Sequence, residues 1–92
     1  MTEEQNVLKV GAQTKPQKLA SAIVNVEKEQ GYVSLQAIGK EANAQAVKAV
    51  AIANNFVKDE GVYFTALPRF VEVEIEDATL TGMRIDLIKH EE

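Results

Sequence analysis

The stretch LQAIGKEANAQAVKAVAIANNF, residues 35–56, decides how this sequence folds. Six of the twelve residues from Ala42 to Ala53 are alanine, and the polar residues among them are two amides and one lysine. At about 100° per residue a helix over 41–57 gathers the apolar side chains into one arc of about 120°. Alanine occupies the centre of that arc, so we expect the helix to pack closely on a neighbouring layer. The arc contains Ala42, Ala46, Ala49, Val50, Ala53, Phe56 and Val57.

The same helix has a third face that is half apolar, and its role is ambiguous. Val47, Ala51 and Asn54 lie on this face together with Asn43 and Lys58. Such a face can pack inside the chain, contact a partner or line a binding site. We treat Val47, Ala51 and Asn54 as a candidate oligomer interface.

On the N-terminal side of this stretch, the sequence predicts two strands and another helix. VLKVGA (7–12) and YVSLQAI (32–38) alternate apolar and polar residues as half-buried strands do. Between them, apolar residues recur at helical spacing after Pro16, a residue suited to a first helical turn, until Gln30-Gly31 ends the helix. In the second strand Val33, Leu35 and Ala37 share one face.

On the C-terminal side the period changes to two. VYFTAL (62–67), FVEVEIE (70–76) and MRIDLIK (83–89) are predicted strands, with residues 77–82 as a hairpin connection. Pro68 either bends one long strand or separates two. The resulting order is β-α-β-α-β-β, an α/β chain in the form of a two-layer α+β sandwich, with two helices on one face of a mixed sheet of about four strands. We expect a single domain over residues 1–92, with frayed tails at 1–6 and 90–92.

The charges are unevenly distributed along the chain. The net charge is −4 and the pI is near 5.0, which argues against a protein that coats nucleic acid by bulk electrostatics. Residues 1–58 carry seven lysines against five acidic residues, whereas residues 59–92 carry three basic residues against nine acidic ones. Any nucleic-acid surface is therefore expected on the first half.

Composition also bears on location. No apolar run approaches the ~20 residues that a membrane span requires, so we expect no membrane contact. The first residues, MTEEQN, are acidic and polar, where a secretory signal would be basic and then hydrophobic. We therefore expect a cytoplasmic protein.

The sequence offers little for catalysis. Cysteine is absent, and the one histidine, His90, is expected in a solvated tail. Glu72, Glu74 and Glu76 share one strand face, which a solvated sheet face explains better than a metal site does. We predict no enzyme, no metal, no cofactor and no small-molecule substrate.

Two lysine-bearing turns are more informative. Gly39-Lys40-Glu41 places a glycine and a lysine before a helix start, where free N–H groups and the helix dipole attract anions. Thr14-Lys15-Pro16 repeats this arrangement at the first helix. Two helix starts that follow parallel strands emerge at the same edge of the sheet. Gly39 is therefore either a simple turn glycine or part of an anion-contacting loop beside Lys15.

The residues QAIGKEANAQAVKAVAIANNFV closely resemble the signature of the stage V sporulation protein S family, and the similarity extends from about Val7 to Lys89. Members of that family are similar to the Alba superfamily of small, dimeric chromatin- and RNA-binding proteins. The resemblance implies that Lys15-Pro16 and Gly39-Lys40 contact nucleic acid, and that the protein acts in sporulation or development. The basic hairpin of Alba proteins has no match here, because this hairpin carries Glu72, Glu74, Glu76 and Asp77.

The leading hypothesis is a regulator that binds DNA or RNA as a homodimer or higher homo-oligomer. Lys15, Lys18, Lys40 and Lys48 are its expected phosphate contacts, with Asn43 and Gln45 as hydrogen-bonding neighbours. The alternative is a protein-interaction or assembly module that uses the Val47, Ala51 and Asn54 face and binds no nucleic acid.

Overall fold

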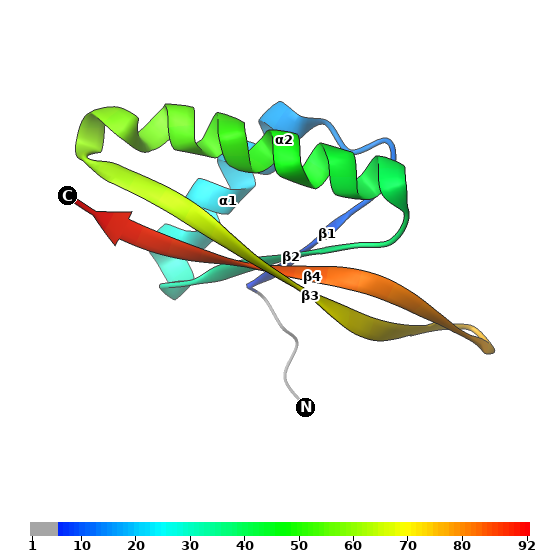
Figure 1. Ribbon diagram of the computed structural model, residues 1–92. Helices are drawn as coiled ribbons and strands as arrows, with labels where there is room; N and C mark the ends of the chain where they lie inside the picture. Colours follow the sequence, from blue (N-terminus) through cyan, green and yellow to red (C-terminus); the bar gives the residue numbers. More distant parts are fainter. Residues whose placement is uncertain (1–5) are drawn as a thin grey trace.

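The computed structural model describes residues 6–92 and shows two helices covering one face of a four-stranded sheet (Figure 1). This is the predicted β-α-β-α-β-β order and two-layer architecture. The elements are β1 (Val7–Val10), α1 (Pro16–Gln30), β2 (Val33–Ala37), α2 (Lys40–Val57), the 3₁₀ turn η1 (Lys58–Glu60), β3 (Val62–Ile75) and β4 (Ala78–Glu91).

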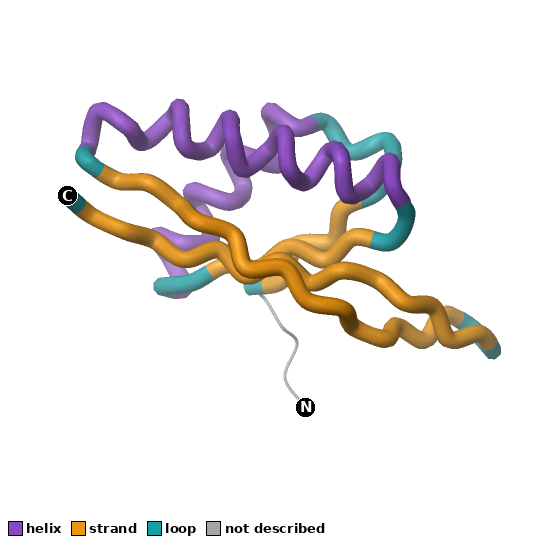
Figure 2. Tube along the Cα trace, in the orientation of Figure 1, coloured by secondary structure: helices purple, strands orange, loops and turns teal. Residues whose placement is uncertain are grey.

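The sheet is mixed, with strand order β1-β2-β4-β3. β1 and β2 are parallel, while β4 is antiparallel to both of its neighbours. Parallel pairing requires a crossover connection, and α1 supplies it. The carboxyl ends of β1 and β2 therefore meet at one edge of the sheet, and both helices start there (Figure 2).

The core lies between the helices and the sheet, where the alternation of β2 and the alanine arc of α2 predict it. Val33, Leu35 and Ala37 are buried on the helix-facing side of β2. From α2 the buried residues are Ala42, Ala46, Ala49, Ala53 and Val57. Phe56 departs from the prediction, since it is 50% exposed, and Val50 is only half-buried. The buried arc is thus narrower than the apolar arc, and bulky side chains at its edges reach solvent.

β3 is one continuous strand through Pro68, which resolves the alternative that the sequence left open. Proline is tolerated there because β3 is an edge strand, whose outward N–H groups need no partner in the sheet. The predicted hairpin connection over 77–82 is wrong. The turn is confined to Glu76 and Asp77, and residues 78–82 belong to β4. Glu76 has a φ of 56°, an uncommon conformation for a residue with a side chain.

The β3–β4 hairpin extends past the rest of the sheet as a two-stranded arm, residues 71–82 (Figure 1). The last β2–β4 pair is Ala37 with Met83, so the arm has no partner in β2. At its base, a Cβ on Gly82 would lie 2.9 Å from Ile38 Cγ1 and 3.1 Å from the Ala37 carbonyl oxygen. Glycine there lets the arm approach the end of β2 closely.

The open end of the β3–β4 hairpin, opposite the turn, also differs from the sequence prediction, which was a frayed tail. β4 continues to Glu91, and His90 is paired with Tyr63 in β3. Residues 1–5 of the other predicted tail lie outside the described residues. Within residues 6–92, neither helix is long and apolar enough to cross a membrane.

Candidate functional site

The two lysine-bearing helix starts lie at the same edge of the sheet, as the parallel strands predict. Lys15 is the N-cap residue of α1, and Gly39 is the N-cap residue of α2, with Lys40 as its first helical residue. Gly39 has a φ of 92° and adopts a backbone conformation that residues with side chains rarely occupy. This geometry explains the glycine without any ligand, so the turn is equally compatible with both of its predicted roles.

Gln45 joins the two helix starts. Its Nε2 atom donates a hydrogen bond to the Thr14 carbonyl oxygen at 3.0 Å and lies 3.5 Å from that of Ala12. The loop that ends in Lys15 is therefore attached to α2. Because both hydrogens of the amide point at this loop, Gln45 positions the loop and is poorly placed to donate to an outside ligand.

Asn43 also acts within the chain. Its Nδ2 atom donates to the Gly39 carbonyl oxygen at 2.8 Å, which closes the first turn of α2 over the glycine. The second amide hydrogen and the side-chain oxygen of Asn43 take no part in this hydrogen bond. Asn43 thus braces the turn that carries Lys40.

The predicted lysines are exposed, but they do not form one tight cluster. Lys15 ends the loop that Gln45 holds, Lys40 begins α2, and Lys18 lies in the first turn of α1. Lys48 is eight residues further along α2 than Lys40, about 12 Å along the helix axis. Lys15, Lys18 and Lys40 therefore belong to the two helix starts, while Lys48 lies further along α2, three residues beyond Gln45. Glu41, in the first turn of α2, is the acidic residue beside them.

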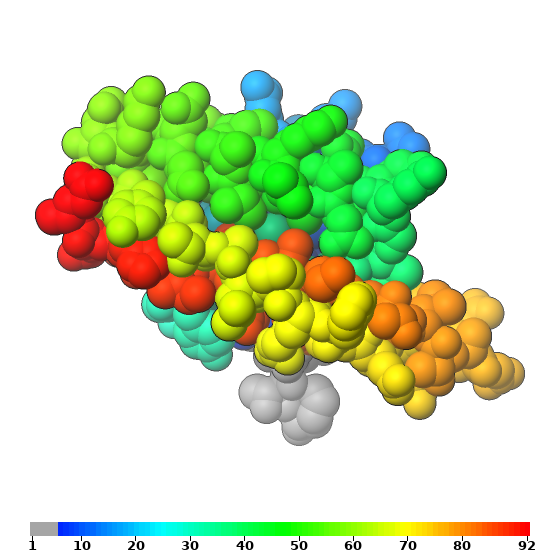
Figure 3. Space-filling view, in the orientation of Figure 1, coloured from blue at the N-terminus to red at the C-terminus, as the bar shows by residue number. Residues whose placement is uncertain are grey.

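The third face of α2 borders an apolar groove. The groove has a volume of about 570 Å³ and runs between α2 and β3, with part of β4 on its floor (Figure 3). Val47, Ala51 and Asn54 line it together with Asn43, Val50, Ala66, Pro68, Met83 and Ile85. The three predicted interface residues therefore share one surface. Val47 is 65% exposed, and Phe70, which follows Pro68 on the same strand face, is 74% exposed.

Asn54 has a structural role in this groove. Its Oδ1 atom accepts a hydrogen bond from Phe64 N at 2.7 Å, and its Nδ2 atom donates to Phe64 O at 3.2 Å. The side-chain amide thus pairs with the backbone of β3 as another strand would. Asn54 attaches the edge strand to α2 and leaves Val47 and Ala51 as the apolar part of the exposed face.

The opposite face of the sheet carries a polar network that the sequence pattern does not indicate. Ser34 Oγ donates to Asp86 Oδ1 at 2.7 Å, and Arg69 Nε forms an ion pair with Asp86 Oδ2 at 3.3 Å. The pKa of Asp86 is lowered from its usual value, chiefly by the Ser34 hydrogen bond and then by Arg69, while partial burial opposes them. Arg84 donates from Nε and Nη2 to Gln36 Oε1. Strand alternation assigns these residues to one face, but it does not indicate that they interact.

His90 lies at the end of the same face and is not the solvated tail residue that the sequence predicts. Its ring stacks on Tyr63 with 4.8 Å between centroids, and its Nε2 atom lies 2.9 Å from Thr65 Oγ1. A hydroxyl and an imidazole at this distance resemble part of a catalytic dyad. A catalytic dyad also needs a group that orients the imidazole ring and donors that stabilise the developing charge. The ring of His90 instead contacts Thr65 and Tyr63.

The carboxylates do not converge. Glu72 and Glu74 are exposed on the arm, and Glu76 lies in its turn. Among residues 6–92, no three histidine, aspartate or glutamate side chains are grouped to hold a metal ion.

A family model described as stage V sporulation protein S matches residues 6–90 of the 92-residue chain. The match includes both helix starts, the α2–β3 groove and the polar network on the opposite sheet face.

Proposed function

The chain belongs to the stage V sporulation protein S family, and from that premise we propose that it is a non-enzymatic, nucleic-acid-binding regulator of sporulation or a related developmental process. Its family supports a role connected with sporulation. The proposed location is the cytoplasm. The proposed ligand is the phosphate backbone of DNA or RNA.

One observation carries the nucleic-acid proposal. The Gln45 hydrogen bond to the Thr14 carbonyl oxygen ties together the two helix starts that bear Lys15 and Lys40. At each helix start the positive end of the helix dipole lies beside a lysine, and the dipole and the lysine both favour phosphate. Lys18 and Lys48 would extend the contact, and Asn43 would brace it.

The charges of the arm disfavour the hairpin as a contact surface for nucleic acid. The acidic hairpin arm is poorly suited to enter a groove of a nucleic-acid duplex, because its carboxylates would repel the phosphates. Duplex or single-stranded nucleic acid would instead lie across the helix starts, and the acidic arm, which projects from the same edge of the sheet, would limit how far the ligand extends toward the hairpin. We expect modest affinity that falls steeply with salt, since few lysines contribute.

The test is a titration of labelled DNA and RNA with wild type and the double variant Lys15→Gln/Lys40→Gln. The matched control is Lys28→Gln/Lys58→Gln, which removes the same charge at the opposite ends of the helices. We expect binding to weaken at least about tenfold in the first variant, a loss comparable to that of a few phosphate contacts. Equal affinities for the two double variants would reject the surface, and absence of binding by wild type at low salt would reject the function.

A second candidate function is assembly, and the α2–β3 groove favours it. We propose that two copies of the chain associate through the exposed apolar side chains of this groove and of neighbouring Phe70. A small domain buries a limited core, and an apolar surface of this kind gains from a partner. If nucleic-acid binding is absent while self-association is strong, the protein is an assembly module. Measurement of molecular mass in solution at several concentrations tests the association.

A further inference from the structure

The face of the sheet that the helices leave open differs in charge from the rest of the protein. Strand alternation places Lys9, Arg69, Arg84 and the acidic Asp86 on this face, and Glu74 of the arm borders Lys9 at its margin. The face is therefore net positive on a chain whose net charge is −4. Such a local excess of positive charge suits an anionic partner.

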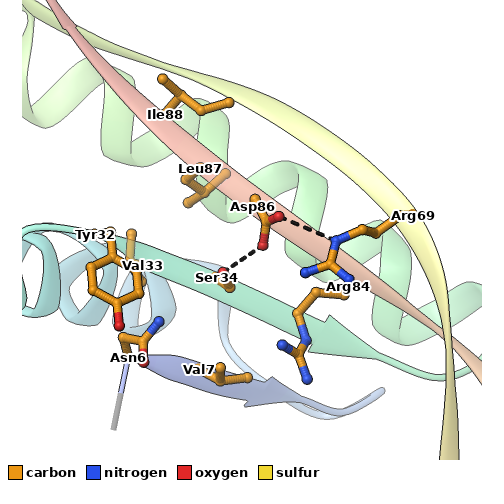
Figure 4. Close-up of a pocket in the computed structure, with 10 residues that line it drawn as sticks. All are labelled: Asn6, Val7, Tyr32, Val33, Ser34, Arg69, Arg84, Asp86, Leu87 and Ile88. Atoms are coloured by element: carbon orange, nitrogen blue, oxygen red, sulfur yellow. Dashed lines mark hydrogen bonds and ion pairs between the residues drawn. The ribbon is translucent and has the colours of Figure 1, made fainter. Parts of the chain in front are cut away.

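The open face is also hollowed. A depression of about 470 Å³ runs across β2 and β4 and is bordered by β1 and β3 (Figure 4). Its volume is within the range of about 300–1,000 Å³ that is usual for sites holding ligand-sized groups. Tyr32 lies at one end, and Arg69 and Arg84 lie at the other (Figure 4). The Ser34–Asp86 hydrogen bond is between them.

The two arginines are held in place by different partners. Arg69 and Arg84 occupy directly opposite positions in the β3–β4 ladder, an arrangement of like charges that is unfavourable by itself. Asp86 forms the ion pair with Arg69 and also attracts Arg84, which donates to the Gln36 side-chain oxygen. Two oriented guanidinium groups at this end of the depression match the geometry of phosphate.

The other end of the depression suits a nucleobase. Tyr32 is 59% exposed, so its ring is accessible to a planar group. Ile88 lines the depression beside it and adds an apolar surface. An aromatic ring and arginines on an open sheet face are the elements with which proteins hold unpaired bases and their phosphates.

We propose that this depression binds a nucleotide unit of single-stranded nucleic acid, with the base against Tyr32 and a phosphate at Arg69 and Arg84. The inference rests on the proposed nucleic-acid function and adds a surface on the side of the sheet opposite to the helices. The helix-start lysines contact only phosphates and accept duplex or single strand alike. The depression requires an unpaired base and therefore gives the protein a preference for single strands.

The experiment compares Tyr32→Ala and Arg69→Gln with two controls, Phe56→Ala and Lys28→Gln. The controls remove an exposed aromatic ring and a positive charge from the helices, which cover the other side of the sheet. Anisotropy titrations use a short oligouridylate, an oligothymidylate of equal length, a duplex and uridine monophosphate. Thermal melts verify that each variant folds, which we expect because all four side chains are exposed.

We expect Tyr32→Ala and Arg69→Gln each to weaken single-strand binding by roughly fivefold or more, with little change for duplex or in the controls. In the wild type, added oligonucleotide should shift the backbone amide NMR signals of Ser34 and Arg84. If both variants bind single strands like wild type while Lys15→Gln/Lys40→Gln is impaired, the inference is wrong and the proposed function stands. If wild type binds no nucleic acid, both are wrong. Mononucleotide binding as tight as strand binding would also overturn the inference.

Discussion

Gln45 Nε2 donates a hydrogen bond to the Thr14 carbonyl oxygen at 3.0 Å, and this contact between residues 31 positions apart unites the two helix starts. It attaches the loop before Lys15 to α2 in addition to the loop's own strand and helix. The contact therefore connects the fold of α2 to the geometry of the candidate interface.

Replacing Gln45 with leucine should test this connection. The variant keeps a side chain of similar size but leaves the Thr14 carbonyl oxygen without its donor, and we expect a loss of about 1 kcal/mol in unfolding free energy. For a chain of this size that corresponds to a fall of roughly 4–8 °C in Tm. Nucleic-acid affinity should also fall although no charge has changed. Gln13→Ala, an exposed change in the same loop, is the control. Unaltered stability and affinity in Gln45→Leu would show that the contact positions nothing.

Asn54→Ala should destabilise the fold through β3. The substitution removes both hydrogen bonds to the Phe64 backbone and leaves two partly buried groups without these partners. We expect a loss of about 1–3 kcal/mol, measured by urea unfolding. Asn55→Ala, on an exposed position of the same helix, should cost much less. Equal midpoints for the two variants would contradict the structural role of Asn54.

Val47→Glu should abolish self-association and leave the monomer folded. Val47 lines the apolar groove and is largely exposed, so a charge there costs little in a monomer but would be buried in a dimer. Light scattering after size-exclusion chromatography should give the dimer mass for wild type and the monomer mass for the variant. Ala44→Glu adds the same charge at an exposed position outside the groove and should remain dimeric. A monomeric wild type, or a dimeric Val47→Glu, would reject the groove as the interface.

The stability of the protein should depend on the ionisation of Asp86. Its pKa is lower in the folded protein than the ordinary value near 3.8, because Ser34 and Arg69 favour the carboxylate. This contribution is fully present above the ordinary pKa and is lost as pH falls through the lowered one. Asp86→Asn should therefore be less stable than wild type at pH 7, and the gap should narrow at pH values below the ordinary pKa.

Thermal unfolding followed by circular dichroism measures the difference in stability between wild type and Asp86→Asn at neutral and at acid pH. Asp59→Asn, at an exposed turn residue, is the control. A gap between wild type and Asp86→Asn that stays constant with pH would contradict the assignment.

The order of elements follows from local patterns, and this explains why it could be predicted. The alternation of Val33, Leu35 and Ala37 and the alanine arc of α2 each identify a buried face without knowledge of the partner. The edges of the core were less predictable. Phe56 lies at one edge of the apolar arc and is half exposed, whereas the next residue, Val57, is buried.

The turn at Glu76 and Asp77 was missed because its positive φ falls on a glutamate, while the Thr-Gly pair further along resembles a turn signal. The candidate site was predictable where it depends on topology. Parallel strands bring Lys15 and Lys40 to one edge whatever the details of packing.

The roles of the amides depend on long-range contacts, which the sequence pattern does not contain. Gln45 and Asn54 each bond to a backbone group in another element, so residues assigned to ligand or partner contact also act within the chain. The Ser34–Asp86–Arg69 network also depends on long-range contacts, because its members are far apart in sequence.

The salt dependence of binding tests the central claim most directly. Lysine contacts to phosphate release counterions, so the slope of log affinity against log salt measures how many such contacts are made. If Lys15 and Lys40 each contact a phosphate, Lys15→Gln/Lys40→Gln should reduce the magnitude of that slope by roughly 1.8 for duplex and 1.4 for single strands. A slope and affinity equal to those of wild type would contradict the claim that the helix starts form the nucleic-acid interface.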